Sequence, residues 1–496
     1  MRYPISRREF LTAAARVGTV LSVSSLAGCW PRGSPHVGSL PLKSVAEVDP
    51  AALRKFGTGL QGQMILPGDP DYESARHVWN WAVDKHPGMI VRCAGTSDVV
   101  RAVDFARSND LLVAVRAGGH SVAGKSTCDG GMVIDVSRMK RIHVDPATQI
   151  ARVESGLTLG EFDHATQAFG LATTLGTAPP TGIAGLTTGG GLGWLMGKHG
   201  IALDNVREVK VVTADGRTLT ANADENADLF WGVRGGGGNF GVITVLEYHL
   251  HPVGSVLGGA VAYPQSKVRE VLRFYREYTS TAPDELTAYA EFMGLPSGQA
   301  FCIAACYSGD LKVGEAVLKP LRRFGRPLAD SFRPMPYVDM QTLLDVPPVP
   351  LAGVIRANFL RELSDDAIDT IAAHMARIPA PACEFFLEHF HGAACRVESS
   401  QTAFAHRTPG YNFATDAIWP VAEAQAADAS VKWVHGLWSA MQPFIGGGVY
   451  SNYLQDEGEG RVRAAYGANY ERLVALKQKY DPTNFFRMNQ NIKPMA

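Results

Sequence analysis

The chain lacks an excess of charge of either sign. It has 47 Lys and Arg residues against 48 Asp and Glu residues, a formal net charge of −1 at pH 7. A protein that neutralises nucleic-acid phosphates carries a basic excess, so no nucleic-acid partner is expected. Hydrophobic residues make up 46% and charged residues 19% of the 496 positions, which excludes a disordered or fibrous chain and leaves length for two or three domains.

None of the seven cysteines belongs to a Cys-x-x-Cys pair. Zinc ribbons and thioredoxin-like sites use that spacing, so neither is expected. Cys302 and Cys306 lie in an apolar run typical of a buried strand, where residues four apart are separated by ~13 Å, too far for a disulfide. Apart from Cys29, six cysteines remain, an even number that permits disulfides without indicating any.

The N-terminus lacks an apolar run long enough to span a membrane. Arg7 and Arg8 precede a short, weakly apolar stretch over residues 12–28, the layout of a twin-arginine export signal. The Leu-Ala-Gly-Cys sequence that ends at Cys29 resembles a bacterial lipoprotein cleavage box. We therefore predict a signal peptide over residues 1–28 and an exported, periplasmic or cell-envelope protein whose membrane contact is a lipid on Cys29. An ordinary N-terminal helix, or export with conventional cleavage, are the alternatives. Residues 29–70 begin with a stretch rich in Pro, Gly and Ser and are predicted to be a linker.

From residue 87, short apolar strands alternate with amphipathic helices. The pattern predicts a β-α-β unit with strands at 89–93 and 111–116 and a helix over 97–108, capped by Ser97. A tail helix is predicted over 460–480, ended by Asp481-Pro482. Other predicted strands are at 132–136, 150–154, 208–213 and 242–250, and other predicted helices are at 158–169, 266–279, 312–324, 364–377 and 419–441.

Many of the 52 glycines fall in three runs, at 118–124, 176–193 and 235–241. Glycine allows the backbone to approach a ligand closely and to present its N–H groups to an anion such as a pyrophosphate. The run that ends at Gly241 contains a Gly-x-Gly-x-x-Gly motif, but a strand follows it where a dinucleotide fingerprint requires a helix, so an NAD-type Rossmann site is not expected. The runs predict a nucleotide-type ligand; ordinary turns are the alternative. His120, in the first run, is either a satisfied polar residue or a nucleophile toward a cofactor.

Several motifs, in order along residues 72–496, resemble the berberine bridge enzyme-like branch of the flavoproteins with the vanillyl-alcohol oxidase/p-cresol methylhydroxylase fold. They include the loop Arg116-Ala117-Gly118-Gly119-His120-Ser121, the turn Asp204-Asn205-Val206 and the segment Asp228-Leu229-Phe230-Trp231. Further motifs are Thr402-Ala403-Phe404-Ala405-His406-Arg407, Tyr450-Ser451-Asn452-Tyr453 and Asp481-Pro482-Thr483-Asn484-Phe485-Phe486.

The resemblance implies an α+β fold. A two-lobed FAD-binding domain of the p-cresol methylhydroxylase type is expected over residues 71–255, and an antiparallel-sheet substrate domain with helices over 256–448. The C-terminal segment, 449–496, is expected to return to the FAD domain and complete it.

For the cofactor, the resemblance implies FAD bonded covalently to His120. Family members with two covalent links use a cysteine where this chain has Ala178, so a single link is expected. Thr181 lies where the family controls the access of oxygen to the flavin. The other residues expected to bind the cofactor are Arg116, Ala117, Gly118, Gly119, Ser121, Thr177, Gly182, Ala184, Gly185, Gly189, Gly190, Gly241, Val242, Ile243, Asn452, Asn489 and Asn491.

Oxidation of an alcohol requires a hydride acceptor and a base for the hydroxyl proton. The resemblance implies that Tyr453 is this base and that Tyr450 lines or supports the pocket. Glu388 lies with Glu384, Phe386 and Phe390 on one face of a predicted strand, which the resemblance places over the substrate. His389 and His391 share the other face; no third ligand is evident, and no metal is expected.

The leading hypothesis is an FAD-dependent oxidase that takes a hydride from a carbohydrate, a secondary metabolite or a similar donor and passes the electrons to O2, giving H2O2. One alternative is a dehydrogenase on the same scaffold with a quinone or protein acceptor. Another is a flavin-binding lipoprotein without turnover.

Overall fold

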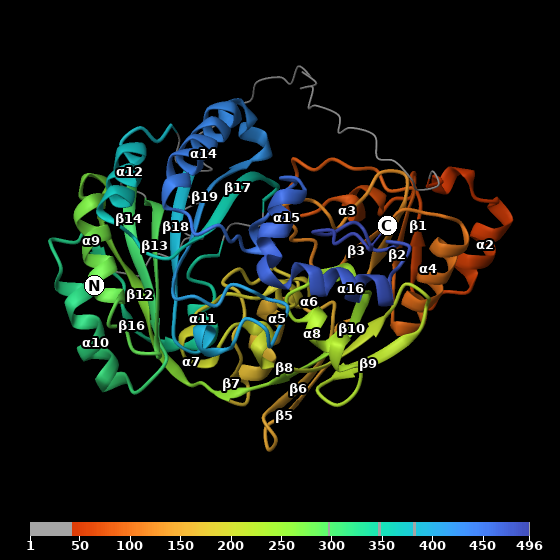
Figure 1. Ribbon diagram of the computed structural model, residues 1–496, viewed down its shortest axis with the longest axis horizontal. Coiled ribbons are helices and arrows are strands. Elements are labelled where there is room, and N and C mark those ends of the chain that lie inside the picture. The colour runs from red at the N-terminus through yellow and green to blue at the C-terminus, as the bar shows by residue number, and fades with distance from the viewer. Residues whose placement is uncertain (1–41, 296–297, 346–348, 380–382, 496) are drawn as a thin grey trace.

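The computed structural model describes residues 42–295, 298–345, 349–379 and 383–495 (Figure 1). The predicted export signal and Cys29 lie outside the described residues. Three main sheets account for most of the strands, and the two smaller sheets form one half of the molecule while the largest forms the other.

The first sheet has four strands in the order β1-β2-β4-β3. Strands β2 and β3 run parallel to the central β4, and β1 joins the edge antiparallel. This sheet and helix α4 enclose one hydrophobic core. The bounds are β1 Gln63–Ile65, β2 Met89–Arg92, β3 Val113–Arg116, β4 Met132–Asp135, α3 Tyr72–Arg76 and α4 Thr96–Ser108.

The described part of the predicted linker is folded, so the linker prediction is wrong for residues 42–70. Helix α2 (Pro50–Thr58) begins with Pro50 at its first position and the Asp49 side chain as its cap. Val45 and Val48 are buried in the first core, and β1 pairs with β2. Residues 42–70 therefore belong to the lobe that is built on the first sheet, which we call the first lobe.

The second sheet is antiparallel, with five strands in the order β5-β6-β10-β8-β9. Helix α5 begins at the Thr158 cap, where Thr158 and Glu161 form a capping box, in agreement with the predicted start. The bounds are β5 Ile142–Asp145, β6 Ile150–Glu154, β8 Val206–Val212, β9 Thr218–Asn222, β10 Val242–His249, α5 Leu159–Gln167, α6 Ile183–Gly189, α7 Met196–His199 and α8 Ala227–Val233; β7 Leu171–Ala172 pairs separately with β11 His251–Pro252.

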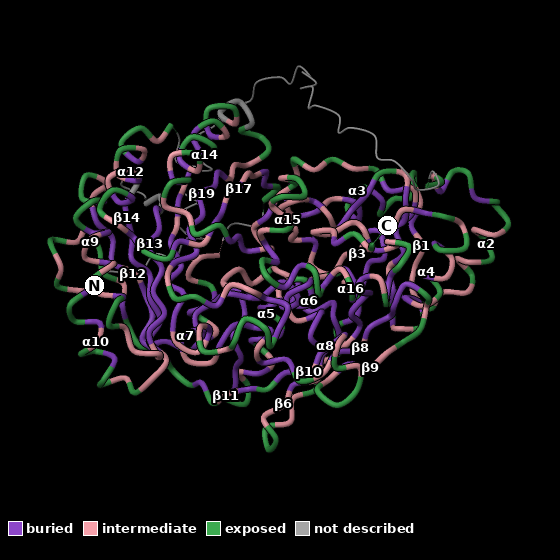
Figure 2. Tube along the Cα trace, in the orientation of Figure 1, coloured by how far each residue is buried: buried purple, intermediate pink, exposed green. Residues whose placement is uncertain are grey.

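The third sheet is the largest, with the order β15-β12-β14-β13-β18-β19-β17 and β16 paired to β12. The cores on its helix side contain apolar residues of α9, α10, α12 and α14, and Figure 2 shows the sheet buried with more exposed helices outside it. The strands are β12 Ser255–Pro264, β13 Leu286–Leu295, β14 Gly298–Tyr307, β15 Ala329–Asp330, β16 Arg333–Pro336, β17 Leu351–Leu360, β18 Cys383–Phe390 and β19 Gly410–Pro420. The helices are α9 Val268–Thr279, α10 Leu311–Arg323, α11 Tyr337–Met340, α12 Asp365–Met375, α13 Ala393–Arg396 and α14 Ala427–Met441.

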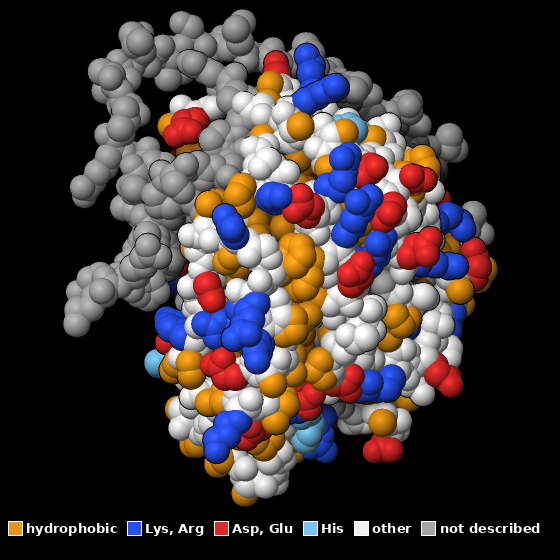
Figure 3. Space-filling view, turned by 90° about the vertical axis from the view of Figure 1, so that its left-hand side faces the viewer, with side chains coloured by type: hydrophobic (Ala, Val, Ile, Leu, Met, Phe, Trp, Pro, Cys, Tyr) orange, Lys and Arg blue, Asp and Glu red, His pale blue; other side chains and the backbone are white. Residues whose placement is uncertain are grey.

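Figure 3 shows the end of the molecule that contains the third sheet and its helices. On this face, positive and negative side chains are mixed around a strip of hydrophobic side chains. Ion pairs join α9 to α12, among them Arg269–Asp369 at 2.6 Å and Arg276–Asp365 at 2.8 Å. These exposed pairs contribute little stability each, about 0–1 kcal/mol.

The C-terminal segment packs back on the lobe that is built on the second sheet, as expected. Buried Lys477 donates to the carboxylate of Asp481 at 2.7 Å and to the carbonyl of Phe486 at 2.8 Å. Asn239, from the third glycine run, donates to the carbonyl of Gln490 and accepts the N–H of Ile492. The tail is thus fixed by side-chain hydrogen bonds to the half of the molecule that contains the first two sheets.

Three predicted helices begin or end differently in the structure. The predicted tail helix is divided into α15 (Glu459–Tyr466) and α16 (Tyr470–Tyr480), because Gly467 adopts a positive φ of 50°. The start of the predicted helix over 419–441 is the end of β19, which pairs with β17, so α14 begins only at Ala427. Helix α4 is capped by Gly95 rather than Ser97, since the Asp98 carboxylate accepts the N–H of Ala94 just before the helix.

The six described cysteines are thiols rather than halves of disulfides, and Cys302 and Cys306 lie buried in β14 as predicted. Among the described residues, no helix combines the length and apolarity that a membrane crossing requires.

Candidate active site

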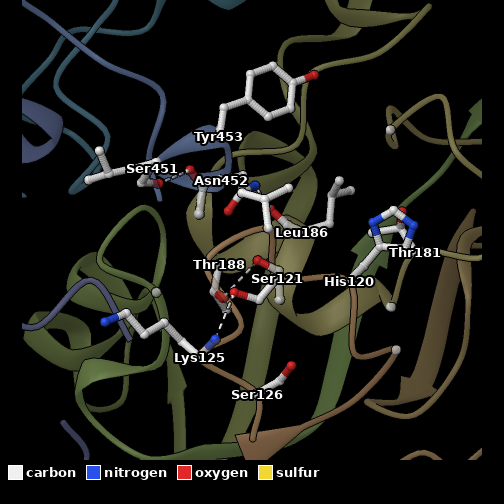
Figure 4. Close-up of a pocket in the computed structure, with 18 of the residues that line it drawn as sticks. His120, Ser121, Lys125, Ser126, Thr181, Leu186, Thr188, Ser451, Asn452 and Tyr453 are labelled. Atoms are coloured by element: carbon white, nitrogen blue, oxygen red, sulfur yellow. Dashed lines mark hydrogen bonds between the residues drawn. The ribbon is translucent and has the colours of Figure 1, made fainter. Parts of the chain in front are cut away.

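A cavity of about 450 Å³ lies between the half of the molecule that contains the first two sheets and the third sheet. Its walls come from the three glycine runs, from one face of β13, β18, β19 and β17, and from the C-terminal segment. In Figure 4, His120 and Thr181 lie on one side of the view, and Ser451, Asn452 and Tyr453 project from the C-terminal segment on another. Residues from distant parts of the sequence therefore meet around one space.

The first two glycine runs touch each other at Gly118 and Gly182. A Cβ on Gly118 would lie 2.3 Å from the backbone nitrogen of Gly182, and a Cβ on Gly182 would lie 2.3 Å from that of Gly118. Neither contact can be relieved by moving a flexible side chain. Glycine at both positions is therefore required for the two loops to form a continuous wall.

Other glycines leave space over the cavity wall. Gly185, Gly237 and Gly238 line the cavity, and a Cβ on any of them would meet no atom within 4 Å. Ser126, also in the lining, has a buried hydroxyl without a hydrogen-bond partner in the described structure. An open backbone wall with an unsatisfied hydroxyl fits a long ligand with polar groups, and these residues accordingly fit FAD.

His120 lies on the loop that follows β3, half-buried in the cavity wall. Its ring stacks on Trp79, with 4.8 Å between the ring centroids. Burial lowers the pKa of His120 to about 4. The imidazole is therefore neutral at ordinary pH, the state in which a ring nitrogen has a lone pair for bonding to carbon.

Most residues predicted to bind the cofactor line this one cavity. They are Ala117, Gly118, Gly119, His120, Ser121, Thr177, Thr181, Gly182, Ala184, Gly185, Gly189, Gly241, Ile243, Asn452 and Asn489, together with Ala178.

Four predicted cofactor residues do not line the cavity. The guanidinium of Arg116 donates instead to a backbone carbonyl of α3. Gly190 lies against the ring of Tyr450, where a Cβ would come within 2.8 Å of the ring. Val242 is buried in the first hydrophobic core, and Asn491 lies beyond the lining, with a buried amide oxygen. Each flanks a lining residue in sequence, but the alternation of a strand or the turn of a loop directs it away from the cavity.

Tyr453 and Glu388 form a hydrogen-bonded pair in the cavity wall. The Tyr453 hydroxyl donates to Oε1 of Glu388 at 3.1 Å, and Nδ2 of Asn412 donates to Oε2 at 2.6 Å. Burial raises the pKa of Glu388 to about 7, although both hydrogen bonds oppose the shift. Burial and the neighbouring Glu388 raise the pKa of Tyr453 well above its usual value.

These shifts change the role expected for Tyr453. A phenol with a raised pKa is a poor base by itself. Its neighbour Glu388, which titrates near neutral pH, is able to receive the phenolic proton as Tyr453 takes one from a substrate. The two side chains are therefore arranged so that a proton on the Tyr453 hydroxyl can pass to Glu388.

Tyr450 is fully enclosed behind this pair and supports the backbone around it. Its hydroxyl accepts the N–H of Gly191 at 2.8 Å and an N–H of the Asn452 amide at 2.8 Å. The same amide donates to the carbonyl of Leu186 at 2.9 Å. Tyr450 thus connects the second glycine run to the C-terminal segment, in the supporting position expected for it.

Several polar residues of the lining were not predicted from the sequence, among them Lys125, Tyr289, Glu291 and Asp416. The sequence did contain an indication for Glu291 and Asp416, because each is the one charged residue of its strand. An acidic residue buried within such a strand is costly unless it has a partner, which marks it as a candidate functional residue.

His389 and His391 stack on each other with 4.1 Å between their centroids. Burial lowers the pKa of both rings, and to about 2 for His389. Within the described residues, no group of three or more His, Cys, Asp or Glu side chains is arranged to hold a metal ion.

Two protein-family models match the chain. The FAD-binding domain family matches residues 87–222, and the berberine and berberine-like family matches residues 449–493. An FAD-linked oxidoreductase of Dictyostelium discoideum is 34% identical over 89% of this chain and 97% of its own length. The (R)-6-hydroxynicotine oxidase of Paenarthrobacter nicotinovorans is 30% identical over 88% of this chain and 97% of its own.

Solved structures agree with this match. The 6-hydroxy-D-nicotine oxidase from Arthrobacter nicotinovorans superposes with a TM-score of 0.81 at 27% identity, over 88% of this chain and 98% of its own. The carbohydrate oxidase from Microdochium nivale has a TM-score of 0.81 at 25% identity, over 90% of this chain and 100% of its own.

Proposed function

Because this chain belongs to the berberine bridge enzyme-like FAD-linked oxidoreductases, we propose that it is an oxidase that removes a hydride from a C–H bond of a small molecule and passes the electrons to O2. The observation that carries the proposal is the hydrogen-bonded pair of Tyr453 and Glu388 in the wall of the cavity that fits FAD.

In the proposed holoenzyme, the glycine wall holds FAD and His120 is bonded to it. FAD supplies a two-electron acceptor for hydride. The neutral His120 ring would provide a nitrogen lone pair for a bond to the flavin methyl carbon. A C–N bond would replace one C–H bond of that methyl group, the methyl carbon and the ring nitrogen would each release a proton, and the two electrons would be taken up by the flavin ring system and passed on to O2. Ala178 lacks a nucleophile, so the single link is through His120. Trp79 keeps the ring in place by stacking on it.

The Tyr453–Glu388 pair takes the substrate proton. The substrate O–H or N–H donates to the Tyr453 oxygen while the Tyr453 hydroxyl donates to Glu388. As the hydride leaves the substrate carbon, the proton moves to Tyr453 and the phenolic proton moves to Glu388. Tyr453 is neutral before and after the step, which agrees with the raised pKa of its hydroxyl.

Relatives support O2 as the electron acceptor. The Paenarthrobacter and Microdochium proteins are named as a hydroxynicotine oxidase and a carbohydrate oxidase, and Thr181 lines the cavity at the position expected to control oxygen access. If the electrons pass to a quinone or a protein instead, the proposal that O2 is the acceptor is wrong.

We further propose export of the protein by the twin-arginine route, with a lipid on Cys29. That route carries folded proteins, which suits a chain that must acquire its cofactor before it crosses the membrane.

The test begins with the purified full chain. We expect flavin that stays with the polypeptide in denaturing gels and a His120 peptide with the added mass of the flavin. His120→Ala should release all flavin on denaturation, whereas His164→Ala, at an exposed histidine of α5, should keep it attached. Flavin lost from the wild-type chain on denaturation would overturn the covalent link.

The acceptor is tested on the same preparation. Flavin reduced by light should be reoxidised rapidly when air is admitted, with formation of H2O2. Slow reoxidation in air combined with rapid reoxidation by a quinone would identify a dehydrogenase instead.

A further inference from the structure

We propose that Asp163 remains a protonated carboxyl up to neutral pH, that it pairs with the side-chain amide of Gln341 through two hydrogen bonds, and that this pair positions the second glycine run. Asp163 lies on α5, which follows a strand of the second sheet, and Gln341 directly follows α11, between strands of the third sheet. The two helices lie against each other (Figure 1). Neither residue takes part in the proposed reaction, so the inference goes beyond the proposed function.

The amide nitrogen of Gln341 connects the third-sheet half of the molecule to the cavity wall. Nε2 donates to Oδ2 of Asp163 at 2.8 Å and to the carbonyl of Gly176 at 3.1 Å. Gly176 lines the cavity at the start of the second glycine run, and Leu344, three residues after Gln341, lines it too. Both Asp163 and Gln341 are buried, so solvent does not compete for these hydrogen bonds. The side chain of Gln341 therefore holds the backbone of the cavity wall directly.

Two oxygen atoms beside these hydrogen bonds have no partner in the described structure. They are Oδ1 of Asp163 and Oε1 of Gln341, and both are buried. A buried acceptor without a donor destabilises the folded state. An ionised carboxylate and an amide oxygen are both acceptors only, so these two atoms cannot satisfy each other while Asp163 is charged.

A proton on Oδ1 of Asp163 satisfies both oxygen atoms at once. The carboxyl O–H then donates to Oε1 of Gln341 while Nε2 continues to donate to Oδ2, so the planar acid and the planar amide form a closed pair. The second N–H of Nε2 remains for the carbonyl of Gly176. Every polar atom of the two side chains then has a partner, and the pair needs no bridging molecule.

The surroundings of Asp163 favour the neutral acid. Burial raises the pKa of Asp163 to about 7, although the hydrogen bond from Gln341 opposes the shift. On α11 the buried Tyr337 faces Asp163, and the pKa of Tyr337 is raised by burial and by a charge on Asp163. The other titratable side chains of α5, α11 and the neighbouring β5 are exposed or half-buried and do not contribute to the shift: Glu161, His164, Asp339, His143 and Asp145.

The stability of the protein reports this proton. In the unfolded chain Asp163 ionises near its ordinary pKa of 3.8, whereas in the folded protein it ionises near 7. Between these two pH values only the unfolded state loses the proton, so rising pH favours unfolding, and above pH 7 both states are ionised and the effect is constant. Asp163→Asn does not titrate, and its amide N–H can donate to Oε1 of Gln341 in the same way.

The first test measures the melting temperatures of the flavin-loaded wild type and of Asp163→Asn at pH 5, 6, 7 and 8. We expect the variant to gain ~3–5 °C relative to the wild type over this range, with most of the gain below pH 7. Asp339→Asn, at an exposed carboxylate of α11, should show no such trend. A difference that is constant from pH 5 to pH 8 overturns the proposal, because Asp163 is then ionised throughout and water satisfies the two oxygen atoms.

Infrared spectroscopy of the wild type detects the proton without any substitution. Labelling aspartate alone with ¹³C separates the C=O stretch of Asp163 from that of Glu388, the other buried carboxyl with a pKa of about 7. We expect a labelled band of a protonated carboxyl at pH 6 that disappears by pH 8.5. The absence of this band at pH 6 overturns the proposal, also where Asp163→Asn fails to fold.

The visible circular dichroism of the bound flavin tests the positioning role. Gln341→Leu and Asp163→Leu each remove the pair, and we expect both to change the spectrum in the same way, with no further change when they are combined. Asp163→Asn, which keeps the pair, should retain the wild-type spectrum. Wild-type spectra in both Gln341→Leu and Asp163→Leu would show that the pair does not position the glycine run. None of these measurements requires turnover, so their outcome is independent of the test of the oxidase.

Discussion

The two walls of the cavity are built from different parts of the polypeptide. The wall of the FAD-binding half consists of loops whose backbones approach each other, as at Gly118 and Gly182. The wall of the third sheet consists of side chains that alternate along strands, such as Glu388 and Asp416. Where two backbones touch, as at Gly118 and Gly182, almost no substitution of glycine is tolerated, and the wall binds one kind of ligand. In a wall of side chains, a single substitution can change which ligand binds.

The largest effect is expected on the backbone wall. Gly118→Val should abolish flavin incorporation, because its Cβ would lie 2.3 Å from a backbone nitrogen of the neighbouring loop. Flavin absorbance per mole of protein measures the loss. Gly254→Ala, where a Cβ meets no atom within 4 Å, is the control and should load flavin normally. Full loading of Gly118→Val would mean that the two loops separate at little cost.

A smaller effect is expected where the C-terminal segment meets the third sheet. Tyr453→Phe removes the hydroxyl that transfers the proton to Glu388, so the rate of flavin reduction by substrate should fall ~10²–10⁴-fold. Flavin content should not change, since the ring and its packing remain. Anaerobic stopped-flow absorbance gives the rate. An unchanged rate would exclude Tyr453 from proton transfer.

Glu388 should determine the pH dependence. Its pKa is raised to about 7, so its carboxylate, the proton-accepting form, accumulates as pH rises through 7. The rate of flavin reduction should therefore increase over that interval and level off above it. Glu388→Gln should be ~10²-fold slower at pH 8 and lack this inflection. An inflection near pH 7 that survives in Glu388→Gln would assign it to another group.

The smallest effect is expected at Trp79. Its stacking on His120 is worth about 0.5–1.5 kcal/mol, so Trp79→Ala should slow covalent attachment of FAD by ~2–10-fold. Trp79→Phe keeps an aromatic face and should retain most of the rate. In-gel flavin fluorescence over time follows attachment, and equal rates in all three proteins would show that the stack does not position His120.

Much of the first wall was predictable from the sequence, and little of the second. The glycine runs and His120 are local motifs, since a close approach of backbones requires glycine whatever surrounds it. Arg116, Gly190, Val242 and Asn491 were assigned to the cofactor from the resemblance, but the direction of each residue depends on strand alternation and loop geometry.

On the third sheet, the acidic residues come from separate strands. Glu291 and Asp416 lie 125 residues apart in the sequence, with Glu384 between them. Only Glu388 was chosen as a site residue, because the resemblance places its strand over the substrate. The sheet pairs β13 with β18 although β14 to β17 lie between them in the chain, and this pairing places the carboxylates around one space.

By itself the sequence determined the family, the α+β class, the glycine loops and the histidine beside them, because these are set by short motifs with local steric causes. Only the tertiary structure decided that Tyr453 is hydrogen-bonded to Glu388, that residues 42–70 pack on the first sheet, and that several carboxylates share one cavity. Burial and cross-strand register, which depend on the whole fold, set the pKa values and the charge of that cavity.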